Sequence, residues 1–390
     1  MRALILLWVL VFLGTEAFSQ VNIPLWHTLG EGGLLEWEAQ AFNEGQRRYR
    51  IQPRFVGDYR ELGVLLTAAL RNGTAPPAAQ VELGFLPVLV REGLAQPLPE
   101  PSNPDLDPEL LRLGEVGGRL YGYPLGISLA VLFYNQEALR ARRLQPPQNF
   151  SQLLEVAERL SSRSAKGLLF SADVYSFALW VLARGGSLSF QGRPAFSGSE
   201  AVSALELLQI LERQGSLQVR SAQELFAAGA DFLRTKAFLA LGPSTLLPAV
   251  QSRTELPFKV GISPIPLEPK GKVAASGSVL VVFRHAPEEV RKGIEGFYQH
   301  LAESNRQLAL AQGAYYLPLS LKAQRSWSRE EVGRLLLGQK TKLVPWHQDS
   351  PLALWAPALE EALEKALKAR MPARQALEEA QRKALAVERR

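Results

Sequence analysis

The chain has 390 residues, with 44 Lys and Arg against 38 Asp and Glu, and a formal net charge of +6. Basic and acidic residues are interleaved, which indicates a solvated surface and argues against nucleic acid as a partner. No cysteine is present, which excludes thiol nucleophiles, zinc–thiolate sites, iron–sulfur clusters and a lipoprotein acylation site. This length predicts two domains with sizeable cores.

The first twenty residues have the pattern of a secretory signal. Arg2 precedes an apolar run, Ala3–Leu13, and small residues follow at Ala17 and Ser19. The run is too short to span a bilayer, which needs about 20 apolar residues. We therefore predict a signal peptide over residues 1–19, cleavage near Ser19, and a soluble protein in the periplasm or an equivalent extracytoplasmic space.

Strand-like and helix-like segments then alternate, which predicts an α/β fold. The expected strands are Ile23–Trp26, Arg50–Phe55, Gln80–Leu83, Val131–Tyr134, Leu168–Ser171, Ala237–Leu241, Lys259–Ile262 and Val279–Phe283. The expected helices are Leu34–Glu44, Tyr59–Asn72, Phe150–Ser161, Ser199–Gln214, Ala222–Ala228, Pro287–Leu301, Arg306–Gly313 and Pro357–Ala369, with a further helix from about Pro372.

Aromatic and small polar residues recur where these strands end and turns begin. In chain order they are Trp26, His27, Tyr59, Ser128, Tyr175, Ser244, Gly277, Ser278 and Tyr316. Each alone is more often structural, but α/β proteins bind ligands at the carboxyl ends of strands. The recurrence predicts a binding site. Trp26 either forms part of its wall or fills the space between its strand and the helix Leu34–Phe42.

Motifs for catalysis or cofactor binding are missing from the sequence. It contains no GxSxG, no Walker loop, no GxGxxG after a strand and no SxxK. The four histidines show neither HxH nor HExxH spacing, so we expect no metal and no cofactor. A pair of catalytic carboxylates assembled across the fold stays open, because single-sequence spacing does not reveal such pairs.

Six segments, in order, resemble the extracellular solute-binding proteins of ATP-binding-cassette importers. They are WHTLGEGG, FNEGQRRYRIQPRFVGDY, NGTAPPAAQV, VLFYN, ASGSVLVV and AYYLPLS. The likeness is greatest to the glycerol-3-phosphate-binding subgroup of the maltose-binding-like receptors. It implies a type II periplasmic-binding-protein fold, with discontinuous α/β lobes joined by a hinge. Lobe 1 would take residues 20–129 and 279–325, and lobe 2 would take 130–278 and 326–390.

The resemblance also implies a ligand site in the cleft between the lobes. Tyr59, Ser128, Gly277 and Tyr316 match positions that resemble ligand contacts of the glycerophosphate receptors, Ser244 matches less closely, and Tyr175 falls where relatives tend to carry Trp. Sugars need hydroxyl partners and aromatic faces, so the full set of expected contacts also includes Trp26, His27, Glu31, Glu82 and Ser278.

Two departures from the subgroup affect the ligand. Glu82 lies one residue away from the acidic position of the subgroup. The late arginine expected to hold phosphate has no clear counterpart, and His347 or Gln348 stands nearest. A glutamine cannot replace the bidentate charged contact that arginine makes with phosphate. Glycerol phosphate, its diesters and an uncharged sugar therefore all remain candidate ligands.

We accordingly expect a monomeric transport receptor with no enzymatic activity, whose partners are a small ligand and the permease subunits of the importer. One alternative is an exported hydrolase acting on glycosides or phosphodiesters, which would need a carboxylate pair or a metal cluster. Another is a pair of receptor-like lobes used for signalling or protein interaction. Turnover of a substrate panel would distinguish the hydrolase from the receptor.

Overall fold

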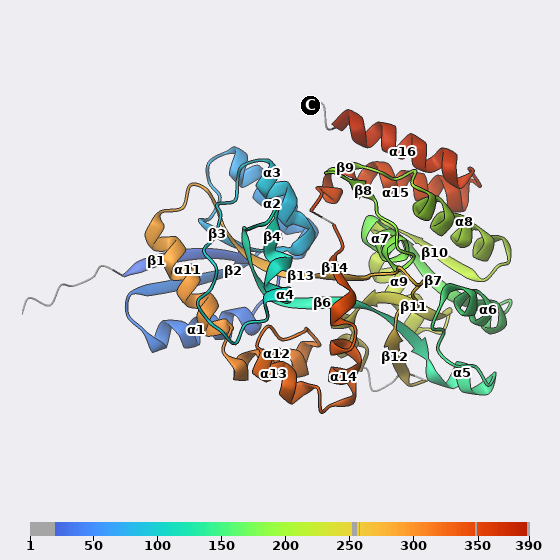
Figure 1. The fold of residues 1–390 in the computed structure, drawn as a ribbon, viewed down its shortest axis with the longest axis horizontal. Coiled ribbons are helices and arrows are strands. Elements are labelled where there is room, and N and C mark those ends of the chain that lie inside the picture. The colour runs from blue at the N-terminus through green and yellow to red at the C-terminus, as the bar shows by residue number, and fades with distance from the viewer. Residues whose placement is uncertain (1–19, 252–255, 257, 348, 388–390) are drawn as a thin grey trace, which may run out of the picture.

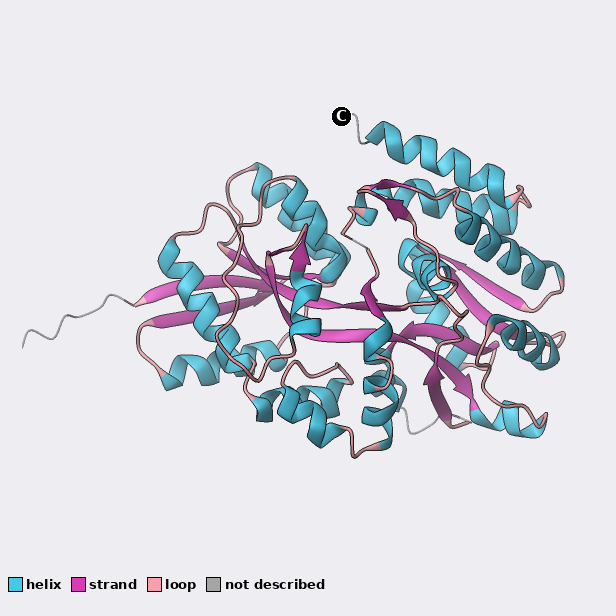
Figure 2. Ribbon diagram, viewed as in Figure 1, coloured by secondary structure: helices cyan, strands magenta, loops and turns pink. Residues whose placement is uncertain are grey.

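The computed structural model describes residues 20–251, 256, 258–347 and 349–387. The predicted signal peptide, residues 1–19, lies outside the described residues. Two α/β lobes stand side by side and are linked by strands that run between them (Figure 1). Figure 2 shows helices covering the strands of both lobes, so the predicted α/β class is confirmed.

The strands are β1 Val21–His27, β2 Tyr49–Phe55, β3 Ala78–Glu82, β4 Glu115–Val116, β5 Arg119–Leu120, β6 Gly122–Asn135, β7 Lys166–Ala172, β8 Ser189–Phe190, β9 Arg193–Pro194, β10 Leu217–Ser221, β11 Ala237–Pro243, β12 Val260–Pro264, β13 Val273–Val282 and β14 Leu343–Pro345. The helices are α1 Leu34–Gly45, α2 Tyr59–Arg71, α3 Leu86–Arg91, α4 Pro108–Leu111, α5 Gln136–Ala141, α6 Phe150–Leu160, α7 Val174–Ala183, α8 Ser199–Arg213, α9 Leu225–Leu233, α10 Leu247–Gln251, α11 Glu288–Leu301, α12 Ser304–Ala314, α13 Leu321–Trp327, α14 Glu331–Leu337, α15 Leu352–Lys368 and α16 Ala373–Val387.

Ten strands form one continuous sheet in the order β10-β7-β11-β6-β13-β3-β1-β2, with β12 paired to β6 and β14 paired to β13. Strands β1, β2 and β3 are parallel to one another, as are β7, β10 and β11. Each parallel group is covered by helices, as parallel sheets require. The antiparallel strands β6 and β13 lie between the two groups and connect them (Figure 1).

Strand β6 changes partners along its length. Its first part, from Gly122 to Leu129, pairs with β13, and its second part, from Ala130 to Asn135, pairs with β11 and β12. All fourteen residues except Tyr134 are buried, and all ten residues of β13 are buried. The two strands therefore satisfy their backbone hydrogen bonds with each other and with their flanking strands, out of contact with water.

Most predicted elements are confirmed, but four were incomplete. The predicted helix Ala222–Ala228 is a 3-10 turn, Ala222–Glu224, followed by α9, which ends five residues later than predicted. The prediction Val131–Tyr134 covers only the end of β6, because Gly122, Pro124 and Gly126 weaken the local strand signal. Helix α15 begins at Leu352, five residues before the predicted start, and Pro357 lies inside it. Strand β13 begins at Val273, six residues before the predicted start.

Helix α7 was not predicted as a helix at all. Seven consecutive residues, from Phe177 to Ala183, are buried, so the helix shows no polar face and no periodicity to detect. Its Trp180 is packed edge-on against Phe150 and Phe170, with ring centroids 5.3 and 6.2 Å away. This helix is a core element, and its first turn carries Tyr175. None of the helices in the described chain combines the length and apolar character needed to cross a bilayer.

Substitution of Gly277 should test the pairing of the crossing strands. Gly277 has φ +127°, and a β-carbon there would lie 2.1 Å from the carbonyl oxygen of Gly126. We expect Gly277→Ala to lower the free energy of unfolding by at least about 2 kcal/mol. Gly63→Ala is the control, because Gly63 lies in helix α2 with open space around it. Urea denaturation with equal midpoints for Gly277→Ala and the wild type would contradict this account.

Candidate functional site

Capped helix starts at the ends of parallel strands place the main site residues. Asp58 caps α2, accepting from the backbone N–H groups of Arg60 and Glu61 at 2.8 and 2.9 Å, which fixes Tyr59 as the first helical residue. Asp173 caps α7 in the same way after β7, through the N–H of Ser176 at 2.8 Å, and places Tyr175 in the first turn. Such caps satisfy donors that a helix start leaves unpaired.

Glu82 ends strand β3 and is held by two donors. One oxygen accepts from the backbone N–H of Gly84 at 2.7 Å, and the other accepts from the indole N–H of Trp346 at 3.0 Å. Burial raises the pKa of Glu82 to about 7, although both hydrogen bonds act to lower it. Both donors are uncharged. Neither hydrogen bond therefore offsets the cost of burying the charge.

Trp346 connects Glu82 to Tyr175. The indole lies directly over Gly84, where a β-carbon would be 2.1 Å from a ring atom, so only glycine leaves room for it. The ring of Tyr175 stands perpendicular to the indole, with centroids 5.6 Å apart. This edge-to-face geometry is favourable for aromatic pairs. The arrangement joins a residue of the β3 end to a residue of α7 through the segment that follows β14.

The hydroxyl of Tyr175 continues the contact chain into the crossing strands. It lies 3.2 Å from Oγ of Ser276 in β13, and Ser276 Oγ lies 2.7 Å from Oγ of Ser128 in β6. Burial raises the pKa of the Tyr175 hydroxyl, and Glu82 and Asp173 raise it further by their nearby negative charge. The hydroxyl therefore stays protonated and keeps its ability to donate a hydrogen bond.

Tyr59 is positioned by a buried glutamine. The backbone N–H and the hydroxyl of Thr28 both donate to Oε1 of Gln80, at 2.9 and 3.1 Å. This fixes the amide so that its Nε2 donates to the Tyr59 hydroxyl at 3.2 Å. The side chain of Tyr59 is 38% exposed, but its hydroxyl is desolvated, and its pKa is raised by burial and by the neighbouring Tyr316 and Glu82. The hydroxyl is therefore held protonated beside Gln80 and Thr28.

Tyr316 and Ser244 both contact the crossing strand β6. A β-carbon on Gly126 would lie 2.7 Å from the ring of Tyr316, so this glycine allows the tyrosine to lie against β6. Ser244 is buried and accepts from the N–H of Leu129 at 3.4 Å while donating to the carbonyl of Tyr315 at 2.8 Å. Ser244 therefore joins β6 to the loop that carries Tyr316.

Gly277 and Ser278 lie in β13 beside this cluster. Ser278 pairs in register with Glu82 of β3 and is almost fully buried. The register of β13 against β6 shifts immediately after it, between Ser278 and Val279. The structure thus brings together, directly or through shared neighbours, the predicted residues Tyr59, Glu82, Ser128, Tyr175, Ser244, Gly277, Ser278 and Tyr316.

The remaining predicted residues lie around the end of β1 and make other contacts. Trp26 is half-buried, with the guanidinium of Arg54 5.7 Å from its ring centroid. His27 is completely buried; its Nε2 lies 3.3 Å from Glu36, and burial lowers its pKa against the opposing effect of that carboxylate. Glu31 is exposed in the Gly-rich turn. No described contact joins these three residues to Trp346 or Tyr175.

Sequence reasoning missed Trp346, Ser276 and the pair formed by Thr28 and Gln80. Thr28, Gln80 and Ser276 were present in segments that we had singled out, and Trp346 directly precedes His347, but Gln80 and Ser276 lie within strands and the partner of Trp346 is distant in the chain. His347, one of the two residues that stand nearest to the missing phosphate-binding arginine, is completely buried, and its Nδ1 accepts from the N–H of Asp349 at 3.0 Å. Gln348, the other, lies outside the described residues.

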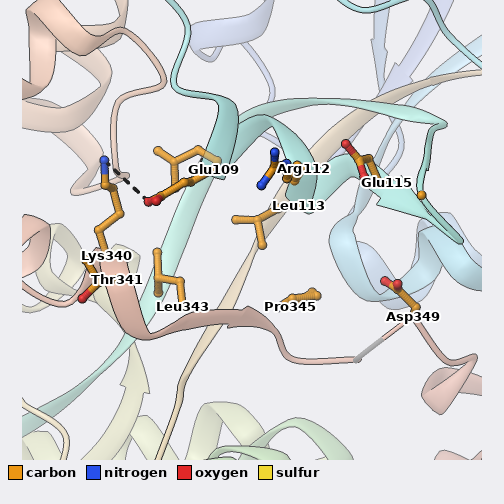
Figure 3. A pocket seen from close by; sticks show the side chains of 11 residues that line it. Glu109, Arg112, Leu113, Glu115, Lys340, Thr341, Leu343, Pro345 and Asp349 are labelled. Atoms are coloured by element: carbon orange, nitrogen blue, oxygen red, sulfur yellow. Dashed lines mark ion pairs between the residues drawn. The ribbon is translucent and has the colours of Figure 1, made fainter. Parts of the chain in front are cut away.

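A separate surface pocket of about 410 Å³ lies beside β14 and contains none of the predicted site residues. Figure 3 shows Lys340 facing Glu109 on one side and Glu115 near Asp349 on the other. The Nζ of Lys340 is 3.9 Å from Glu109 and 2.6 Å from Asp107, so its charge is already paired. Within the described residues no group of three or more His, Cys, Asp and Glu side chains is placed to hold a metal.

Comparisons with known proteins agree on one family. Residues 38–331 match the sequence profile of the bacterial extracellular solute-binding proteins. The chain is 22% identical over 366 residues to the sn-glycerol-3-phosphate-binding periplasmic protein of Brucella melitensis, covering 85% of this chain and 82% of that protein. It is 25% identical over 338 residues to the protein of the same name from Yersinia pestis, covering 79% and 76%.

Solved structures show the same fold. The GacH receptor of Streptomyces glaucescens, studied with acarbose, matches with a TM-score of 0.81 at 16% identity, over 95% of this chain and 98% of that one. UgpB from Mycobacterium tuberculosis, in complex with glycerophosphocholine, matches with a TM-score of 0.80 at 15% identity, over 95% and 99%. The predicted two-lobed binding-protein fold is therefore confirmed.

The buried His347 should make stability depend on pH. Burial lowers its pKa from 6.5 to about 3, so the unfolded chain binds a proton that the folded chain does not. Its contribution to stability is present above about pH 6.5 and is lost as pH falls below that value. We expect the wild type to lose about 2 kcal/mol more than His347→Gln between about pH 6.5 and pH 4.5.

The wild type must be compared with His347→Gln because Glu82 also titrates over this pH range. Its raised pKa stabilises the folded protein as the pH falls, which opposes the effect of His347. Urea denaturation at each pH measures the difference. His285→Gln, at an exposed histidine, is the matched control and should behave as the wild type. Parallel pH profiles for the wild type and His347→Gln would show that the assigned role of His347 is wrong.

Proposed function

Because this chain belongs to the bacterial extracellular solute-binding protein family, we propose that it captures a small polar molecule between its lobes and delivers it to the permease of an ATP-binding-cassette importer. The observation that carries the proposal is the contact chain from Glu82 through Trp346, Tyr175 and Ser276 to Ser128. It joins elements of both strand groups at the crossing strands, where a ligand would contact both lobes.

The ligand we propose is a sugar, a glycerol phosphate or a glycerophosphodiester. The relatives from Brucella and Yersinia are named for sn-glycerol 3-phosphate, and the solved structures include complexes with acarbose and with glycerophosphocholine. The site contains rings at Tyr59, Tyr175, Tyr316 and Trp346 and hydroxyl and carboxyl groups beside them. Rings pack against the C–H faces of such ligands, and the polar groups pair with their hydroxyls.

Lobe closure would bury the ligand and opening would release it. We place the lobes at residues 20–129 with 279–325 and at 130–278 with 326–390. The change of partners within β6 between Leu129 and Ala130 supports the first boundary. Few strands cross between the lobes, which favours a hinge at β6 and β13. Delivery requires release, so moderate affinity linked to closure suits the function.

The protein would act outside the cytoplasm, as a monomer, after removal of residues 1–19, and would leave its ligand chemically unchanged. The extracellular family and the periplasmic relatives support this location. We expect the two crossing strands and the aromatic cluster beside them to hold the ligand. The relatives are binding proteins. We therefore propose no hydrolytic reaction.

A ligand panel tests the proposal directly. Mature protein is titrated by calorimetry with maltose, maltotetraose, sn-glycerol 3-phosphate and glycerophosphocholine, and each ligand is recovered and analysed by mass spectrometry. We expect at least one ligand to bind and to be recovered intact. If neither these four ligands nor other sugars and glycerophosphates bind, the receptor proposal is contradicted. Conversion of a bound ligand to hydrolysis products would contradict the absence of catalysis.

Tyr175→Ala should weaken the binding of whichever ligand is found. The substitution removes a ring that faces Trp346 and a hydroxyl that reaches Ser276. The loss of one aromatic face corresponds to about 1.5 kcal/mol, or roughly a tenfold higher Kd. Tyr121→Ala is the matched control, because Tyr121 is a half-buried tyrosine before β6 that belongs to no part of the cluster. Equal Kd values for the Tyr175 variant and the wild type would remove Tyr175 from the site.

A further inference from the structure

His27 is a buried titratable residue that the proposed function does not yet use. Its side chain is completely buried at the end of β1, and neither ring nitrogen has a hydrogen-bond partner among the described residues. Nε2 lies 3.3 Å from Oε1 of Glu36, but the ring is not aligned to make a hydrogen bond to it. Buried polar groups are costly unless they are paired, so an unpaired histidine at this position needs a physical reason.

The groups packed around His27 carry little charge. On β2 the ring of Phe55 lies with its centroid 6.0 Å away, and β3 contributes the uncharged Gln80, which bonds the residue after His27. Helix α11 approaches β1 at Ile23, four residues earlier. Within the described residues Glu36 of α1 is the one charged side chain that acts on His27, and burial lowers the pKa of the ring more than Glu36 raises it. The folded site therefore favours the neutral ring.

Glu36 also holds the turn that joins β1 to α1, residues 28–33. Its Oε2 accepts from the backbone N–H of Gly32 at 3.1 Å, while its Oε1 is the oxygen near His27. A single carboxylate thus contacts both the buried histidine and the far end of the turn. Any change in the charge of the histidine therefore acts directly on the group that holds the turn.

The near end of the same turn supports a site tyrosine. Thr28 directly follows His27, and its backbone N–H and hydroxyl donate to Gln80 at 2.9 and 3.1 Å. The amide nitrogen of Gln80 donates in turn to the hydroxyl of Tyr59 at 3.2 Å. The position of the turn and the position of Tyr59 are therefore connected through one buried glutamine.

The start of α1 is held less firmly than the starts of the other helices of the site. Asp58 caps α2 and Asp173 caps α7, but Gly33 precedes α1 and no side chain caps this helix. A β-carbon on Gly30 or on Gly32 would meet no atom within 4 Å. The turn therefore has open space around it, into which it can move at small cost.

We propose that His27 is a pH-sensitive latch for the turn over residues 28–33, and that its protonation weakens ligand binding. The inference rests on the proposed receptor function and adds a means of regulating that site. At neutral pH the ring is uncharged and the turn stays closed over it, so Thr28 keeps Gln80 and Tyr59 in place. In acid the ring takes up a proton, the turn opens to hydrate the charge, and the support of Tyr59 is lost.

The reason is the cost of burying a charge. An imidazolium has two N–H donors, and among the described residues the closed turn offers Glu36 to Nε2 and no acceptor to Nδ1. An open turn lets water reach the ring, so the open state binds the proton more tightly than the closed state does. Acid therefore shifts the protein toward the open state. The affinity for a ligand that needs the closed turn falls as the pH drops through the pKa of His27, which lies below 6.5.

Calorimetry with maltotetraose and glycerophosphocholine at about pH 7.5 and about pH 5.0 tests the latch, because neither ligand titrates between these values. Glu82 and His347 also respond to pH, so the quantity to compare between variants is the ratio of Kd at the lower pH to Kd at the higher pH. We expect this ratio to be about fivefold larger for the wild type than for His27→Gln, which has no ring to protonate.

His300→Gln is the matched control. His300 lies 3.2 Å from Glu38 of the same helix α1 but has no described contact with the turn, so this variant should keep the wild-type ratio. Equal ratios for the wild type and His27→Gln would overturn the inference and leave the receptor function intact. Failure of the whole ligand panel to bind would contradict the receptor function instead.

Hydrogen exchange on the unliganded wild type tests the latch without a ligand or a variant. After correction for intrinsic exchange rates, the backbone amides of Thr28 and Gly32 should lose protection at least about threefold between pH 7.5 and pH 5.0. The amide of Ile51, which donates to the side chain of Asn43 at 2.8 Å, is the internal control and should keep its protection. Unchanged protection of Thr28 and Gly32 would show that the turn does not respond to the proton, which would overturn the proposal.

Discussion

The antiparallel pairing of β6 with β13 is the constraint on which the structure depends. Both strands are buried over almost their whole length, so every backbone polar group must find a partner within the protein. That requirement aligns the parallel strand groups on either side and fixes which side chains meet between them. Gly126 and Gly277 lie where other parts of the chain approach these strands closely, and a β-carbon at either position would collide with them. The strands that hold the fold together thus also carry Ser128, Ser276 and Ser278 of the candidate site.

The polar side chains of the site are held in position more by hydrogen bonds between uncharged groups than by ion pairs. Gln80 is fully buried, and its amide is oriented by two donors from Thr28 before it reaches Tyr59. Ser276 lies within hydrogen-bond distance of both Tyr175 and Ser128. Buried polar groups are costly unless paired, so these networks hold their members in place without a ligand. A site prepared in this way loses less conformational freedom when it binds.

The local sequence pattern was sufficient to predict helices and strands that bury one face. It failed for elements that are buried on all sides. The alternation and periodicity of residues predicted β1, α1, β2 and α2 closely, because their polar residues mark the exposed side. Helix α7 offers no such contrast, and the glycines of β6 obscured its first half. Tyr59, Tyr175 and Glu82 were predicted because caps and strand ends have local signals. Trp346 had none, since the residue it bonds, Glu82, lies 264 positions earlier in the chain.

Trp346 also explains the electrostatic character of the site. A buried carboxylate such as Glu82 can be stabilised by a cation, which lowers its pKa, or by neutral donors, which leave most of the cost of burial in place. The indole N–H is a neutral donor, and the pKa of Glu82 accordingly stays raised, at about 7. A guanidinium in the same position would have reversed that shift and supplied a charged contact for phosphate. The neutral donor that follows β14 therefore leaves the pKa of Glu82 raised, whereas a cation in its place would lower it.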